Sequence, residues 1–137
     1  MADKGIMNAF KSLYETEKQS DFVIACGGHE FKVHKLVLLT QSSVLYEMAS
    51  NERFKECQSA RLELCDDDLE CVTAMIRYIY LHNYEVPKER EKGRLSFHMR
   101  MASIADKYNI VHLETCAAGK FLRQTCQHQD PKSSQTR

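Results

Sequence analysis

The first third of the chain alternates between helical and strand-like hydrophobic patterns. Four large apolar residues recur at helical spacing and predict a short amphipathic helix: Ile6, Phe10, Leu13 and Tyr14. The uninterrupted apolar run Phe22–Cys26 is typical of a strand buried on both faces. Gly27-Gly28 then supplies the two positive-φ positions of a tight hairpin turn, so residues 29–33 are expected to return as a second strand.

The middle of the chain predicts a helix pair followed by a lone strand. Residues 36–39 form a short apolar run that fits a single helical turn, and Ser42 or Ser43 can cap a further helix. The polar segment 51–59 is expected to be a loop that carries Phe54. Alternation at residues 61–64 predicts the third strand.

The second half is predicted to be helical. Asp67 followed by Glu70 resembles a capping box, and apolar spacing carries the helix from there to a stop near Asn83. Residues 86–93 contain a charge run and are expected to form a loop within the domain. Two more helices follow, and the polar segment 125–137 is expected to be a disordered tail. The expected divisions are therefore a leader helix (1–19), one folded domain (20–124) and the tail.

Composition narrows the function more than the fold. At 137 residues, with 43% apolar and 28% charged residues, the chain fits one ordinary globular domain. Nineteen basic residues balance nineteen acidic residues, so no overall field attracts nucleic acid or an anionic membrane. The start lacks a secretory signal and no apolar run is long enough to cross a bilayer, which favours the cytoplasm or nucleus.

The sequence contains only weak signals for catalytic or metal-binding sites. Six irregularly spaced cysteines in a chain without an export signal are expected to be reduced. Cys26 and His29 have the spacing of half a zinc site, but no second pair matches them. There is no nucleophile-elbow sequence and, with five glycines, no phosphate-cradling loop. We expect no metal, no cofactor and no catalytic residue.

The order of the short motifs resembles the BTB/POZ family, over about residues 8 to 123. The resemblance rests on Asp21 with its apolar strand, Phe31-Lys32-Val33-His34-Lys35, Phe54-Lys55-Glu56, Leu62-Glu63-Leu64, Asp66-Asp67-Asp68, Tyr78-Ile79-Tyr80 and Ala105-Asp106-Lys107-Tyr108. The sequences of these motifs are most similar to those of BTB proteins from filamentous fungi. The resemblance implies an α+β fold in which a small three-stranded sheet is flanked by about five to six helices, and a non-enzymatic role in protein–protein interaction.

The same resemblance implies three sites. In family members that recruit cullin scaffolds, a hydrophobic-x-Glu segment makes the contact, which here points to Phe54 and Glu56. Tyr80 and Tyr84 are expected to extend this patch, because aromatic residues are enriched in interface cores. The helix with Ile6, Phe10, Leu13 and Tyr14 is the expected homodimer element. Asp21 and Lys35 stand where the family places a charged pair near a partner groove.

Several alternatives stay open. Phe54 can be exposed for a partner or folded back over the helices, and the carboxylate of Asp21 can simply accept backbone hydrogen bonds. His34 is expected to be a hydrogen-bonded structural residue. The expected function is an adaptor for a cullin ubiquitin ligase; the alternatives are an oligomerisation scaffold without cullin binding and, more remotely, an enzyme that uses Cys and His.

Overall fold

The computed structural model describes the backbone of residues 3–136 and the side chains of residues 5–88 and 92–124. Within these residues the chain forms a three-stranded sheet, seven α-helices and one 3-10 helix. In chain order the elements are α1 (Asp3–Thr16), β1 (Phe22–Cys26), β2 (His29–Val33), α2 (Lys35–Gln41), α3 (Ser43–Ser50), α4 (Lys55–Ser59), β3 (Arg61–Glu63), α5 (Leu69–Leu81), η1 (Lys88–Gly93), α6 (Arg94–Lys107) and α7 (Val111–Thr136). The α+β class is confirmed, with more helices than the five to six expected.

The sheet is mixed and has the order β2-β1-β3. β1 and β2 form the predicted hairpin, with Gly27 at φ 56° and Gly28 at φ 81°, a conformation that side chains with a Cβ rarely adopt. β3 pairs with β1 in parallel, so that Val23 lies opposite Arg61. β1 is therefore the central strand, which explains why it is continuously apolar.

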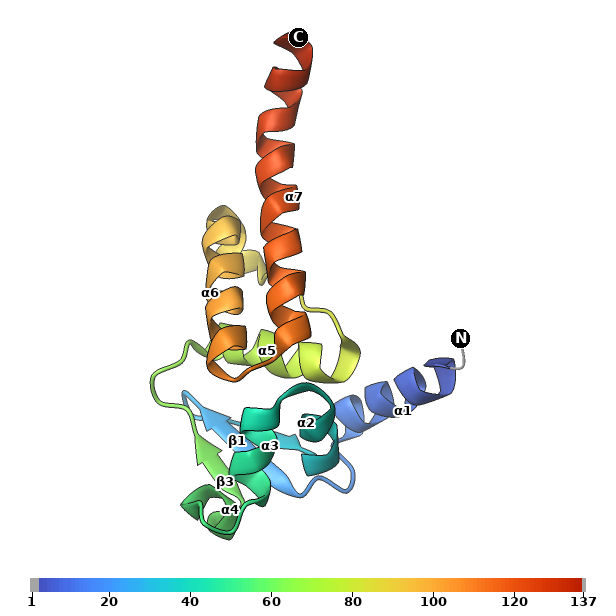
Figure 1. Ribbon diagram of the computed structural model, residues 1–137, viewed down its shortest axis with the longest axis vertical. Coiled ribbons are helices and arrows are strands. Elements are labelled where there is room, and N and C mark those ends of the chain that lie inside the picture. The colour runs from blue at the N-terminus through green and yellow to red at the C-terminus, as the bar shows by residue number, and fades with distance from the viewer. Residues whose placement is uncertain (1–2, 137) are drawn as a thin grey trace.

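Helix α5 separates two halves of the molecule (Figure 1). The sheet with α2, α3 and α4 lies on one side, and the hairpin of α6 and α7 lies on the other. Because it is covered from both sides, α5 is buried around most of its circumference rather than along one stripe. Its buried residues are Cys71, Val72, Ala74, Met75, Ile76, Tyr78, Ile79 and Tyr80.

Three local expectations differ from the structure. The predicted capping box at Asp67 is wrong, because Asp68 is the N-cap of α5 and Asp67 bonds elsewhere. The charge run lies in the 3-10 helix η1 rather than in an irregular loop. The segment expected to be a disordered tail continues as α7 to Thr136, since extending a helix needs no new nucleus; its side chains lie outside the described residues.

Candidate functional site

Phe54 lies at the rim of an apolar groove on the surface of α3. The groove has a volume of about 390 Å³ and is lined by Ser43, Val44, Glu47, Met48 and Phe54. α3 turns Leu45 and Ala49 into the core, which leaves Val44 and Met48 half-buried on its outer side. Because these two residues are four positions apart, they lie on one helix face.

The backbone holds Phe54 in this position. Its amide donates to the carbonyl of Asn51 at 3.0 Å, and its own carbonyl accepts from Cys57 at 3.1 Å. Phe54 is the N-cap of α4 and keeps 38% of its surface exposed. The two readings of Phe54 thus combine, since its side chain forms a wall of the groove and still reaches solvent.

Glu56 lies two residues further, in the first turn of α4. Its side chain is half-buried, and among the described residues its carboxylate has no hydrogen bond or ion pair within the chain. An acidic group near a helix N-terminus is favourably placed in the field of the peptide dipoles. Glu56 therefore offers an acceptor two residues after Phe54.

The turn between α6 and α7 is tied to the start of α3. The buried hydroxyl of Ser42 accepts from the amide of Leu45 at 3.0 Å and donates to the carbonyl of Tyr108 at 2.7 Å. The side-chain amide nitrogen of Asn109 donates to the hydroxyl of Ser43 at 3.0 Å. Val111, just after this turn, is 59% exposed. Sequence reasoning missed Val44 and assigned Met48 to the inner face of α3, because apolar character alone does not tell a groove from a core.

Tyr80 and Tyr84 do not belong to this surface. Each is only 1% exposed, because α5 and the segment after it are enclosed by both halves of the molecule. The hydroxyl of Tyr80 bonds to His34, and that of Tyr84 lies 2.7 Å from Nδ1 of His98. Burial raises the pKa of both phenols well above the ordinary value. The expectation that they extend a cullin-contact patch is wrong for this reason.

His34 is a structural residue, as expected. Its Nε2 lies 2.6 Å from the carbonyl of Lys18 and its Nδ1 lies 2.6 Å from the Tyr80 hydroxyl. A carbonyl can only accept, so Nε2 carries a proton and the Tyr80 hydroxyl donates to Nδ1. The same hydroxyl oxygen accepts from the backbone amide of His34 at 2.9 Å. The ring therefore ties the segment before β1 to α5.

Asp21 and Lys35 meet through the backbone. The Asp21 carboxylate accepts from the amide of Lys35, the first residue of α2, at 2.8 Å. This hydrogen bond confirms the reading of Asp21 as a carboxylate that satisfies backbone donors. Their role as a charged pair facing a partner stays a prediction.

The amphipathic face of α1 is largely used within the molecule. Phe10, Leu13 and Tyr14 pack against the core, where the Tyr14 ring lies 5.6 Å from that of Tyr80. Ile6 is 59% exposed and stands apart from them. On α2, Leu36 and Leu39 are also exposed, at 72% and 50%. These exposed apolar residues, rather than the whole α1 stripe, are free for self-association.

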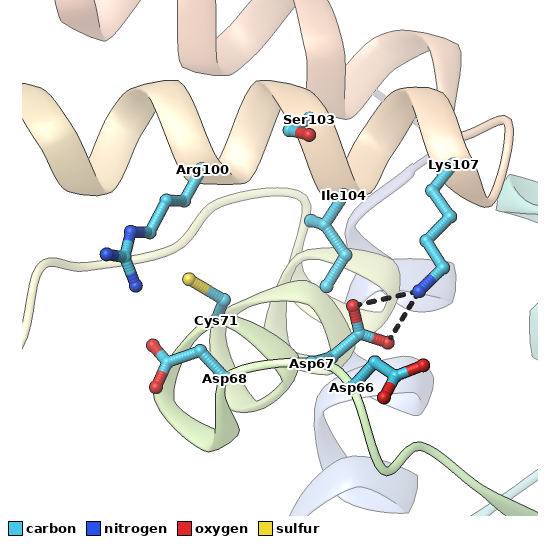
Figure 2. Close-up of a pocket in the computed structure, with 8 residues that line it drawn as sticks. All are labelled: Asp66, Asp67, Asp68, Cys71, Arg100, Ser103, Ile104 and Lys107. Atoms are coloured by element: carbon cyan, nitrogen blue, oxygen red, sulfur yellow. Dashed lines mark hydrogen bonds and ion pairs between the residues drawn. The ribbon is translucent and has the colours of Figure 1, made fainter.

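A pocket of about 300 Å³ between α6 and the start of α5 gathers several reactive residue types (Figure 2). Asp67 is its most engaged member: both carboxylate oxygens accept from Lys107 Nζ, at 3.1 and 3.2 Å, and one accepts from the Tyr108 hydroxyl at 2.7 Å. The Asp67 carbonyl accepts from the Cys26 thiol at 3.3 Å. Burial and the nearby Asp67 and Asp68 raise the pKa of Cys26, which makes it a poor nucleophile. These contacts stabilise the fold.

The described residues offer neither a metal site nor a membrane-spanning helix. No group of three or more His, Cys, Asp or Glu side chains comes together there in a way that could hold a metal ion. Cys26 is buried, whereas its supposed zinc partner His29 is exposed, and its ring packs at a tilt against that of Phe31, with ring centres 4.5 Å apart. None of the described helices is both long and apolar enough to span a membrane.

Comparison with known proteins identifies the family. TD and POZ domain-containing protein 3 of Mus musculus is 31% identical over 117 residues, which are 81% of this chain and 29% of that protein. BTB and MATH domain-containing protein 42 of Caenorhabditis elegans is 28% identical over 104 residues, or 76% of this chain and 24% of that protein. The chain thus spans under a third of these curated relatives. Both are animal proteins, so the likeness to fungal members stays a prediction.

The sequence pattern of the BTB/POZ domain matches residues 10–125, nearly the whole of the described fold. This match agrees with the order of strands and helices in the structure. A BTB domain is a non-catalytic interaction module, which removes the Cys/His enzyme from the alternatives. The chain belongs to the BTB/POZ domain family.

Proposed function

We propose that this BTB domain acts as an adaptor that binds a cullin scaffold through Phe54, Glu56 and the groove on α3. The observation that carries the proposal is the half-exposed Phe54 beside an apolar groove. A large aromatic side chain at the edge of a preformed groove is the kind of anchor that dominates interface energies. Because backbone hydrogen bonds already hold Phe54, little ordering entropy would be lost on binding.

Glu56 gives this surface its charge preference. Its carboxylate has no partner among the described side chains, so a basic residue of a cullin could pair with it without breaking an existing contact. Charges at the rim of an interface affect association rate and partner choice more than affinity. In this proposal Phe54 provides the apolar anchor for the cullin, and Glu56 determines which partner is selected.

Calorimetry with a cullin N-terminal domain tests this proposal. Phe54→Ala is expected to weaken binding by roughly 30-fold, since an interface anchor commonly contributes about 2 kcal/mol. Met99→Ala removes an even more exposed apolar side chain, 61% against 38% for Phe54, from α6 and is the control. Glu56→Lys is expected to slow association, and Glu15→Lys on α1 controls for the charge reversal. Equal binding by Phe54→Ala and wild type would contradict the site.

A second candidate is self-association without cullin binding. The exposed side chains of Ile6, Leu36 and Leu39 support it, because such residues mark interaction surfaces when they gather on one face. Phe10 and Leu13 are unsuitable for a test, since they pack against the core. Ile6→Asp and Leu36→Asp are expected to give a folded monomer by light scattering. An assembly that survives both changes, with no cullin binding by the wild type, would contradict both candidates.

A further inference from the structure

A second concave site, distinct from the Phe54 groove, lies where α6 and α7 face the segment after α5. It has a volume of about 290 Å³. Three stretches far apart in the chain line it: residues 83–86, the start of α6, and the fourth turn of α7. Its lining residues are Asn83, Tyr84, Glu85, Val86, Arg94, His98, Lys120, Arg123 and Gln124.

Positive charge dominates this site. Arg94 from α6 and Lys120 and Arg123 from α7 all line it. Among the described lining residues, Glu85 is the one carboxylate beside these three cationic side chains. Like charges brought together on a folded surface repel one another, and a bound anion would relieve that repulsion.

Two contacts orient the cationic groups. Lys120 Nζ lies 5.2 Å from the centre of the Tyr84 ring, a cation–π distance that holds the ammonium group over the ring. The Arg123 guanidinium lies back along α7, with one terminal nitrogen 3.7 Å from the place that a Cβ on Gly119 would occupy. Lys120 and Arg123 are three positions apart and so lie on one face of α7, and both line the same site as His98.

The pKa of His98, which lines the same site, is shifted by burial and by the neighbouring cations. Burial, together with the smaller effect of the charges on Lys120, Arg94 and Arg123, lowers its pKa to about 4. The ring is therefore neutral at pH 7, and the raised pKa of Tyr84 keeps its hydroxyl protonated. The pairing that satisfies this hydroxyl has it donate to Nδ1 of His98, 2.7 Å away, which leaves Nε2–H as the donor of the ring.

We propose that Arg94, His98, Lys120 and Arg123 form a binding site for a phosphoryl dianion, either free phosphate or the phosphate of a phosphorylated serine. Arginine forks and a lysine ammonium are the groups that bind phosphate in proteins. The net positive balance favours a dianion over the single charge of a carboxylate. A volume of about 290 Å³ accepts the phosphoryl group together with the side chain that carries it.

The test follows chemical shifts at pH 7.5 during titration with inorganic phosphate, at constant ionic strength. Saturable shifts of the His98 ring and of the Arg123 Nε–H signal are expected. Arg123→Gln and Lys120→Gln should each weaken binding by roughly tenfold or more, the typical effect of losing one charge-assisted hydrogen bond. Both side chains are at least partly exposed, so both variants should fold.

Matched controls and a second ligand distinguish the outcomes. Arg53→Gln removes an exposed arginine far along the chain and should leave the titration unchanged. A short phosphoserine peptide that binds more tightly than free phosphate, with no binding by its unphosphorylated form, would assign the site to modified proteins; equal affinity would assign it to the free anion. Shifts that rise linearly without saturation, or that are the same in Lys120→Gln and Arg123→Gln as in wild type, would overturn the proposal.

Discussion

Two buried tyrosines, Tyr80 near the end of α5 and Tyr84 just beyond it, each meet Nδ1 of a buried histidine. The Tyr80 hydroxyl serves two groups of His34, and the other ring nitrogen of His34 bonds to the chain before β1. His98, in contrast, lines an open site among three cations. The tyrosine–histidine pair therefore ties chain segments together in the case of Tyr80 and His34. In the case of Tyr84 and His98 it lies beside a cationic surface.

The largest effect should come from Tyr80→Phe. This change leaves both the backbone amide and Nδ1 of His34 without a partner in a dry core, which is expected to cost about 2–4 kcal/mol of unfolding free energy. Urea denaturation measures it. Tyr46→Phe, at a half-buried tyrosine, should change stability by less than about 0.5 kcal/mol. If Tyr80→Phe lowers the unfolding free energy by less than about 1 kcal/mol, the Tyr80–His34 pair is no more important for stability than the Tyr84–His98 pair.

The pH dependence of stability should come next. His98 has a pKa of about 4 when folded, against 6.5 in the unfolded chain, so the unfolded state binds more protons between these values. Stability is therefore retained above pH 6.5 and is lost as the pH falls towards 4, by at most about 1.4 kcal/mol per pH unit from this group. Comparing urea midpoints of wild type and His98→Gln between pH 7 and 5 isolates the effect. Parallel curves would show that His98 does not contribute.

Tyr84→Phe should have a smaller effect than its counterpart on α5. Only Nδ1 of His98 loses a partner, and the neighbouring cavity of about 290 Å³ allows water to approach the ring. We expect a loss of about 1 kcal/mol in the same denaturation experiment. A loss equal to that of Tyr80→Phe would mean that the two pairs are energetically equivalent.

The smallest stability effect is expected for Lys120→Gln. Removing one cation near His98 should raise the pKa of that ring, while unfolding free energy changes by less than about 0.5 kcal/mol. Histidine ring signals followed by NMR against pH measure the change. Lys32→Gln, on the exposed strand β2, is the control and should leave His98 unaltered. If the pKa of His98 is unchanged in Lys120→Gln, the charge of Lys120 does not act on His98.

The two tyrosines also show where prediction from the sequence succeeds and where it stops. Local rules placed the hairpin at Gly27-Gly28 and narrowed the cap to Ser42 or Ser43, because neighbouring residues alone decide those conformations. They did not show that Tyr80 and Tyr84 are buried, because that burial depends on elements distant in the chain that pack around α5 and the segment after it.

The candidate sites divide in the same way. Phe54 and Glu56 are close in sequence, so a short pattern was enough to single them out. The groove beside Phe54 requires Val44 and Met48 from α3, and the cationic site requires Arg94 to meet Lys120 and Arg123. Residues that come together only through helix packing leave no local pattern, which is why composition gave no indication of a basic patch.

Strand β1 pairs with β2 and with β3, and the two pairings close loops of very different length. Val23 pairs with Lys32 across a tight turn, whereas its pairing with Arg61 closes a loop that contains α2, α3 and α4. Closing a longer loop loses more chain entropy before any contact forms, so the hairpin is expected to assemble early and β3 to dock late. The groove on α3 and Phe54 both lie within that intervening stretch. The surface that we propose for cullin binding would therefore mature only in the final steps of folding.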